Sequence, residues 1–94
     1  MKKKTRPAAH YRIVDGVAHR EIEGQTLLLV GSESGLLTLN ATGQFIWRRL
    51  VKARNVATIV TAFQREFGVT TDVARRDVGV FLDMLESRQI VRRG

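Results

Sequence analysis

Cysteine is absent from this chain of 94 residues, and proline occurs only once. Without cysteine there is neither a disulfide framework nor a thiolate metal site, which is typical of proteins in the reducing cytoplasm. The longest apolar runs, residues 27–30 and 36–39, are far too short to cross a bilayer. No apolar segment follows the lysine-rich start, so we expect no export signal. The sequence therefore predicts a cytoplasmic protein without a membrane segment.

Residues that could carry catalysis are also scarce. His10 and His19 lie early in the chain and lack the spacing of metal ligands. The serines lack a G-x-S-x-G context, and the glycines do not form the phosphate-binding pattern G-x-x-x-x-G-K-[ST]. We therefore interpret the chain as a protein that is not an enzyme, and we expect it to need neither a cofactor nor a metal ion.

The excess of positive charge lies at the two ends of the chain, whose formal net charge is +7. Residues 1–12 hold five basic and no acidic side chains, Arg92 and Arg93 add two more, and residues 13–91 are balanced. Basic tails more often aid solubility than bind nucleic acid. We expect residues 1–12 to be a flexible basic tail and residues 13–94 to form a single domain.

Apolar runs and turn signals predict three antiparallel strands. The runs at residues 17–22 and 25–30 are separated by Glu23-Gly24, which is typical of a two-residue hairpin. A turn-like segment follows, and residues 36–39 then predict a third strand. This third strand should lie at an edge of the sheet unless the N-terminal segment pairs beside it.

Three helices are predicted after the strands, at roughly residues 42–52, 56–67 and 71–88. Residues that favour helix ends stand at each boundary: Asn40 or Thr42, Asn55, Gly68, and Thr70 or Thr71. The sequence thus predicts an α+β fold in which a three-stranded antiparallel sheet is followed by three helices.

The third helix carries a wider apolar surface than packing on one neighbour requires. Its core line holds Ala74, Val78, Phe81 and Leu85; Val73, Val80 and Met84 lie on one flank and Leu82 on the other. Asp77 lies within this apolar arc, which spans about 200°. Two interpretations stay open. Either the flanks cover the sheet and the second helix while Asp77 bonds a nearby group, or one flank lines a groove that a partner fills.

The third strand offers a second binding feature, because a peptide could add to its unpaired edge through main-chain hydrogen bonds. We expect Leu37→Pro to remove a donor from that edge. A dense basic cluster follows at Arg48, Arg49, Lys52 and Arg54, and it is either a solvated helix face or a docking patch for an acidic partner.

Two motifs in the chain resemble those of a known family. L-N-x-T-G-x-x-I-W stands at residues 39–47, and D-V-x-x-F-L-x-x-L stands at residues 77–85. Together with Arg20, Gly24 and residues 27–29, they make the chain similar to the PqqD-like peptide chaperones, which are also called RiPP recognition elements. The pair of motifs is more specific than either motif alone.

This resemblance implies a fold in winged helix-turn-helix style and a function in peptide binding. Such proteins bind the leader segment of a ribosomally made precursor peptide as a strand added beside the third strand and the third helix. They deliver it to a modifying enzyme, such as a radical S-adenosylmethionine enzyme, a cyclase or a peptidase. The contacts implied here are Leu36, Leu37, Thr38, Leu39, Arg75, Arg76, Gly79, Leu82, Asp83 and Glu86. Helical periodicity does not decide which flank of the third helix faces the groove.

Two alternatives remain open. A winged-helix DNA-binding protein would set Arg75, Arg76 and the basic tails against phosphates. Acidic residues on the same helix disfavour this alternative: Asp72, Asp77, Asp83 and Glu86. A homodimer that pairs edge strands or swaps the N-terminal segment is the second alternative, and it is compatible with peptide binding.

Overall fold

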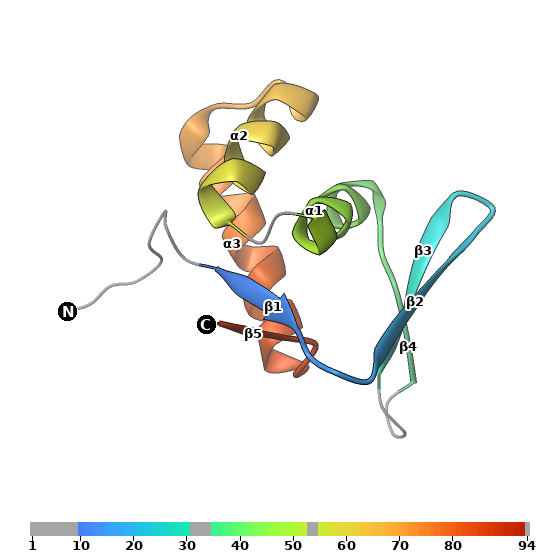
Figure 1. Ribbon diagram of the computed structural model, residues 1–94. Coiled ribbons are helices and arrows are strands. Elements are labelled where there is room, and N and C mark those ends of the chain that lie inside the picture. The colour runs from blue at the N-terminus through green and yellow to red at the C-terminus, as the bar shows by residue number, and fades with distance from the viewer. Residues whose placement is uncertain (1–9, 31–34, 53–54, 94) are drawn as a thin grey trace.

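The computed structural model of the chain describes residues 10–30, 35–52 and 55–93, and it contains a sheet, three helices and a short strand pair (Figure 1). The elements in chain order are β1 (Tyr11–Ile13), β2 (Val17–Ile22), β3 (Gln25–Val30), β4 (Gly35–Thr38), α1 (Ala41–Lys52), α2 (Val56–Phe67), α3 (Thr71–Ser87) and β5 (Val91–Arg93). The sheet has the order β2-β3-β4. The predicted α+β fold, a three-stranded antiparallel sheet followed by three helices, is confirmed.

The β2–β3 hairpin closes through the two residues that the sequence predicts. Glu23 and Gly24 both have positive φ angles, 53° and 79°, which a right-twisted two-residue hairpin requires. The strands pair from Ile22 with Gln25 at the turn to Val17 with Val30 at the open end. This register puts alternate residues of β3 on the face toward the helices, where Leu28 is completely buried.

The N-terminal segment pairs with the end of the chain rather than with the sheet. β1 and β5 form a separate antiparallel pair in which Tyr11 faces Arg93, and Val14 N–H donates to the Ile90 carbonyl at 2.9 Å. The expected boundary of the flexible tail at residue 12 therefore differs from the structure, because the Tyr11 ring is buried and its backbone is in a strand. The rest of the expected tail, residues 1–9, lies outside the described part of the chain.

The helix ends lie where the capping residues indicate. Asn40 Oδ1 accepts from Gly43 N–H at 2.9 Å, Asn55 caps α2, and Thr70 caps α3. α1 begins one residue earlier than expected, because Asn40 rather than Thr42 is its cap. Gly68 ends α2 in the left-handed conformation at φ 63°, as predicted.

The core is formed mainly by the three helices, with Leu28 and Leu39 from the side of the sheet and Tyr11 and Val91 from the β1–β5 pair. Trp47 of α1 is its largest fully buried side chain. The Trp47 ring meets His19 of β2 edge to face, with 5.9 Å between ring centroids. α1 is also tied to β3, because Thr26 N–H donates to Gln44 Oε1 at 2.8 Å. These contacts fix α1 across the sheet, so that α1 sets the position of α3 relative to β4. Within the described segments, no helix has the length and apolar character needed to span a bilayer.

Candidate functional site

The free edge of β4 exposes the main-chain groups of Leu36 and Thr38. Leu39 N–H donates to the Thr26 carbonyl at 3.0 Å, so these two opposite residues form a hydrogen-bonded pair. Hydrogen-bonded pairs alternate with non-hydrogen-bonded pairs along an antiparallel ladder. The N–H and C=O of Leu37 therefore also point toward β3, whereas those of Leu36 and Thr38 point outward. The two-residue turn makes Ile22 and Gln25 a hydrogen-bonded pair of β2 and β3, and this indicates the same alternation of hydrogen-bonding directions along β3. In the described part of the chain, no strand pairs with this outward edge.

The expectation that Leu37 supplies an edge donor is therefore wrong. Its N–H and C=O belong to the β3–β4 ladder, and its half-buried side chain packs against the core. Leu39 is buried, and its N–H is also engaged with β3. Of the four strand residues predicted for peptide contact, Leu36 and Thr38 alone turn their main-chain groups to the free side.

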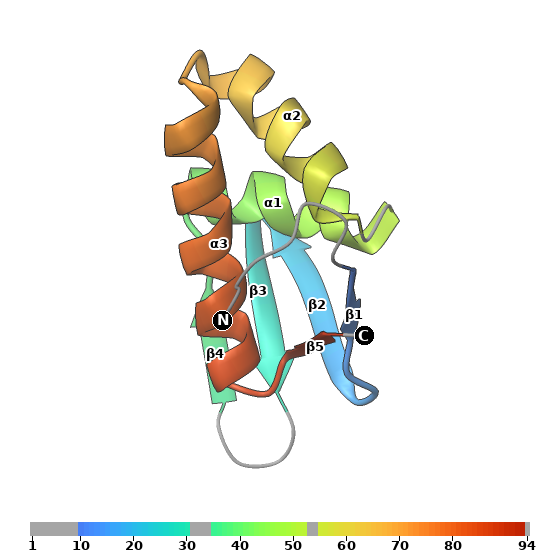
Figure 2. The same ribbon diagram turned by 90° about the vertical axis from the view of Figure 1, so that its left-hand side faces the viewer.

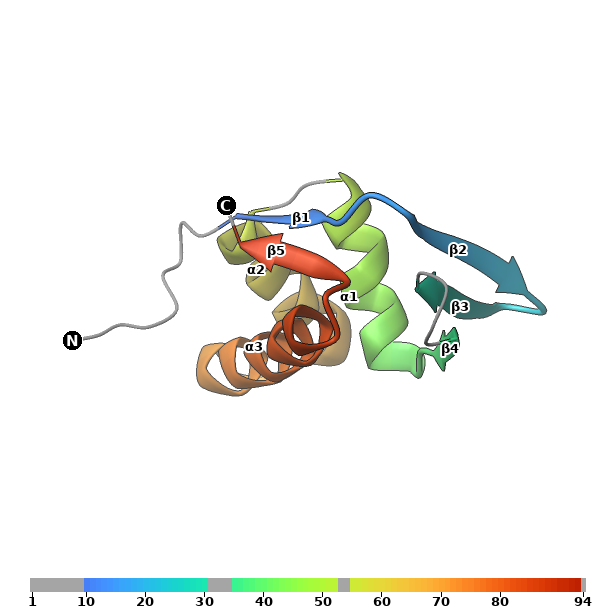
Figure 3. The ribbon, with the colours of Figure 1, turned by 90° about the horizontal axis from the view of Figure 1, so that it is seen from below.

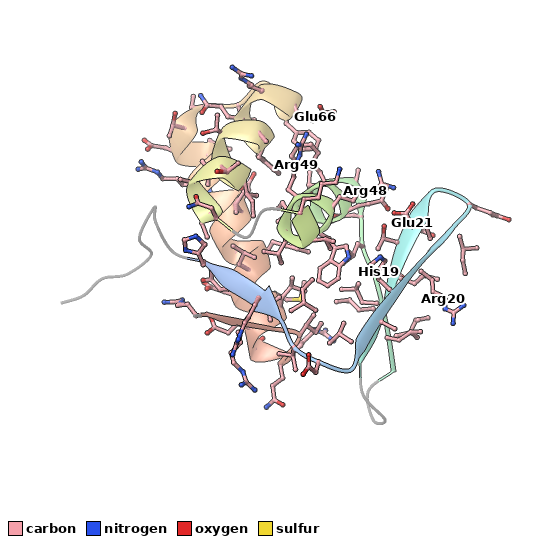
Figure 4. The ribbon with its side chains drawn as sticks, in the orientation of Figure 1. His19, Arg20, Glu21, Arg48, Arg49 and Glu66 are labelled. Atoms are coloured by element: carbon pink, nitrogen blue, oxygen red, sulfur yellow. The ribbon has the colours of Figure 1, made fainter. Side chains whose placement is uncertain are left out.

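The two edges of the sheet differ in chemistry. β4 reads Gly-Leu-Leu-Thr and has no charged residue, whereas β2 carries His19, Arg20 and Glu21. Arg48 of α1 reaches to Glu21, with Nη2 at 2.9 Å from Oε1 and Nε at 3.1 Å from Oε2 (Figure 4). Charges on an edge strand disfavour the addition of another strand. β4 is thus the edge that is open to a partner strand.

Phe81 shows which flank of α3 lies toward β4. A Cβ placed on Gly43, at the start of α1 just after β4, would be 2.8 Å from Cε1 of Phe81. In Figure 2, α3 is drawn in front of β4 on the left of the view, and β1 lies on the right. Seen from below in Figure 3, α1 lies between the sheet and α3. The Phe81 side of α3 therefore faces the space beside the β4 edge.

Five α3 residues share this side, within about 100° of the helix circumference. We define the Phe81 flank as Val73, Asp77, Val80, Phe81 and Met84. Val80 is 63% exposed and Leu36 on β4 is 59% exposed, so large apolar side chains face solvent on both elements. The molecule thus has an uncharged strand edge at β4 and a mostly apolar flank on α3, and the start of α1, which follows β4, lies against that flank.

The opposite flank of α3 borders a different cavity. This groove between α2, α3 and β1 has a volume of about 680 Å³. We call it the α2–α3 groove, and its α3 wall includes Arg75, Arg76, Gly79, Leu82 and Asp83. Leu82 is buried in the core, and Glu86 lies near β5, with Oε1 at 3.5 Å from Arg93 Nη2.

The residues implied by the sequence resemblance thus divide between two places. Leu36 and Thr38 lie at the open strand edge, whereas five of the six α3 residues line the α2–α3 groove and Glu86 lies near β5. The structure does not bring these two groups together around one groove. Peptide contact by the ten residues stays a prediction, and the Phe81 flank is the part of α3 that complements the β4 edge.

The sequence matches the family model described as coenzyme PQQ synthesis protein D (PqqD) over residues 26–91. The chain belongs to the PqqD family. No curated protein gives a significant match. The matched residues run from β3 to β5, and they include both motifs and the whole Phe81 flank.

Two solved structures resemble this PqqD-family protein closely. One is described as TbiB1 in complex with the TbiA(beta) leader peptide; it is 27% identical, with a TM-score of 0.80, over 86% of this chain and 94% of the other. The second is described as lasso peptide synthetase B1 complexed with the leader peptide. It is 21% identical, with a TM-score of 0.81, over 89% of this chain and 99% of the other. At this identity, the likeness shows a common fold and no more.

The basic cluster of this PqqD-family protein is partly engaged within the molecule. Arg48 pairs with Glu21, and the Arg49 guanidinium lies 4.9 Å from the centroid of the Phe45 ring. Lys52 is exposed, and the fourth member, Arg54, lies outside the described residues. Two of the four basic residues, Arg48 and Arg49, therefore interact with side chains of the protein itself. This accords with the interpretation of the basic cluster as a solvated helix face rather than a docking patch.

The sequence identifies four residues of the Phe81 flank as apolar, Val73, Val80, Phe81 and Met84, but none of them was selected for the site. One signal was present in the sequence, since Gly43 in the first motif and Phe81 in the second are a small and a large residue that can pack together. Their pairing decides the orientation of α3, and it requires the packing of α1 against α3.

Proposed function

We propose that this PqqD-family protein binds the leader segment of a ribosomally made precursor peptide by strand addition. The peptide lies beside β4 and along the Phe81 flank of α3. The observation that carries this proposal is the free, uncharged β4 edge, where the main-chain groups of Leu36 and Thr38 face outward. A strand added there forms main-chain hydrogen bonds, and alternate side chains reach α3.

The likeness to two leader-peptide complexes supports this proposal. TbiB1, at 27% identity, is described as bound to a leader peptide, and the second neighbour has the same architecture. The DNA-binding alternative receives no support from these neighbours. Asp72, Asp77 and Asp83 also interrupt the positive charge that a helix lying against phosphates would need.

The expected affinity follows from the groups available. Leu36 and Thr38 present two N–H donors and two C=O acceptors, and each hydrogen bond contributes roughly 0.5–1.5 kcal/mol net. Apolar anchors against Val80 and Phe81 add to this, and ordering of the peptide subtracts from it. The balance corresponds to dissociation constants of about micromolar to sub-micromolar.

We further propose that the protein acts as a partner of a peptide-modifying enzyme rather than as a catalyst. The enzyme would be a radical S-adenosylmethionine enzyme, a cyclase or a peptidase. Binding through the leader segment leaves the rest of the precursor free for modification. Across the described segments, no group of three or more potential metal-ligating side chains occurs.

A nitrogen–proton NMR titration with a leader peptide encoded next to this protein tests the proposal. We expect the largest shifts at Leu36, Thr38 and the Phe81 flank, and small shifts at Arg75 and Asp83 across the helix. Shifts confined to the α2–α3 groove would contradict strand addition at β4. Absence of any shift at millimolar leader, together with binding to duplex DNA, would favour the alternative function.

A further inference from the structure

Asp77 is the one charged residue of the Phe81 flank. It lies one helical turn from Val73, Val80 and Phe81, so these side chains surround it on the helix surface. Its side chain is 47% exposed. A carboxylate in the middle of an apolar helix face lowers the apolar area that a partner can contact. An interaction between this carboxylate and a basic group would offset that loss.

The protein itself gives Asp77 little compensation. Among the described residues its one ion pair is with Arg76, whose Nε lies 3.8 Å from Oδ1 and whose side chain is 69% exposed. Adjacent residues on a helix point in different directions, and exposed pairs of this kind contribute little. Arg76 also borders the α2–α3 groove on the far side of the helix. The Asp77 carboxylate therefore remains available on the Phe81 flank.

The other acidic residues of α3 either have a role in the fold or lie in the α2–α3 groove. Asp72 lies in the first turn, where a negative charge complements the helix dipole. Glu86 pairs with Arg93 of β5. Asp83 lies on the wall of the α2–α3 groove, away from β4. Asp77 is thus the acidic residue of α3 that faces the space beside the β4 edge.

A peptide strand beside β4 would exclude water from this carboxylate. An ionised carboxylate only accepts hydrogen bonds, and covering it without a donor is unfavourable. The main-chain groups of the added strand point within the sheet, so the donor has to come from a side chain that faces α3. Lysine and arginine side chains supply donors and the opposite charge, and such hydrogen bonds are the strong ones.

We propose that Asp77 is a specificity-determining residue that selects a leader peptide with a lysine or arginine facing the Phe81 flank. This inference rests on the proposed leader-binding function and adds the chemistry of the peptide to it. In such a leader peptide, alternate side chains face α3. Among these, apolar side chains contact Val80 and Phe81, and a basic side chain contacts Asp77. The net charge of +7 favours acidic peptides at long range, so a single preferred basic position would report local contact with Asp77.

A displayed library of random peptides tests this assignment without knowledge of the natural leader. The library is selected separately on the full chain, on Asp77→Asn, on Asp77→Lys and on the matched control Asp83→Asn. We expect the unmodified protein and Asp83→Asn to enrich lysine or arginine at one position of an otherwise apolar consensus. Asp77→Asn should lose that preference, and Asp77→Lys should favour aspartate or glutamate there.

Affinity measurements on one selected peptide give the size of the effect. Replacing its basic residue with alanine should weaken binding to the unmodified protein about 10-fold, as expected for a charged hydrogen bond. The same replacement should change binding to Asp77→Asn by less than about twofold. Thermal unfolding curves of the variants identify any general loss of structure, which is not expected at this half-exposed position.

The outcomes separate this inference from the function on which it rests. Selected peptides that shift Leu36 and Thr38 in NMR spectra but show no basic preference would overturn the role of Asp77 alone. The same holds for a basic preference that persists in Asp77→Asn and Asp77→Lys. Selected peptides that leave β4 unshifted would overturn both the leader-binding site and the role of Asp77.

Discussion

Phe81 of α3 lies directly against Gly43 at the start of α1. A Cβ added to Gly43 would be 2.8 Å from Cε1 of Phe81 and 3.2 Å from Oδ1 of its cap, Asn40. Real Cβ atoms do not approach other atoms as closely as the first distance, so the ring would have to move. The absence of a side chain at one position thus fixes where α3 lies relative to β4.

Gly43→Ala should lower the free energy of unfolding by about 1–3 kcal/mol, because it overpacks this contact. The higher helix propensity of alanine offsets roughly 0.5–1 kcal/mol of that loss. Chemical denaturation measures the change. Gly79→Ala is the matched control, since Gly79 is also helical and an added Cβ there meets nothing within 4 Å. This control should leave stability unchanged or raise it, and equal losses in both variants would contradict the close approach.

Proline substitutions separate the two sides of β4. Leu36→Pro removes an N–H that faces the free edge, so the protein should fold and bind leader about 10-fold more weakly. Leu37→Pro removes an N–H from the β3–β4 ladder and should destabilise the sheet itself. Circular dichroism measures folding, and fluorescence anisotropy with a labelled leader measures binding. Normal leader binding by a folded Leu36→Pro protein would argue against strand addition.

Val80→Ser tests the Phe81 flank. Val80 is 63% exposed, so the substitution should leave stability nearly unchanged. It should weaken leader binding about 3- to 10-fold, because roughly 1 kcal/mol of apolar burial is lost. Arg75→Ser, on the α2–α3 groove, is the comparison variant and should bind normally. The reverse pattern in isothermal titration calorimetry would place the peptide in the α2–α3 groove.

Tyr11 should make stability depend on alkaline pH. Burial raises the pKa of the Tyr11 hydroxyl above its ordinary value of 10.0, although the Arg93 charge opposes the rise. Because the folded-state pKa is the higher one, the neutral hydroxyl contributes stability that is fully present below the unfolded pKa. That contribution is lost as the pH rises through the folded pKa.

Unfolding by denaturant at a series of pH values from about 8 to 11.5 measures this effect. The protein should lose more free energy of unfolding above pH 10 than Tyr11→Phe, which has no hydroxyl to ionise. Other basic and acidic groups are common to both proteins and cancel in the comparison. Parallel pH profiles for the two proteins would show that Tyr11 ionises equally easily when folded and unfolded.

Most of the fold could be predicted because its signals are local. Glu23-Gly24 specifies the hairpin turn, while Asn55 and Gly68 bound α2 through hydrogen bonds within a few residues. The pairing of β1 with β5 was missed. Each strand has three residues and little alternation, and their partners lie at opposite ends of the chain.

The candidate site could be predicted only in part. The sequence identified the third strand as an edge and Val73, Val80 and Met84 as one apolar flank of α3. The family resemblance implied peptide contact instead at residues such as Arg75 and Asp83, which line the α2–α3 groove. Helical periodicity divides a helix into faces, but it carries no information about which neighbour covers each face.

The sequence by itself determined the β2–β3 hairpin, the third strand of the sheet, the three helices with their caps and the family motifs, since these depend on residues close together in the chain. Tertiary structure decided two further points. The hydrogen bond between Leu39 and Thr26 sets the bonding pattern of β4, so the main-chain groups of Leu36 rather than Leu37 point toward the free edge. The contact of Phe81 with Gly43 decided that the Phe81 flank, which includes Asp77, lies on the side of α3 toward the start of α1. Both depend on packing between segments distant in sequence, where shape rather than local propensity selects the arrangement.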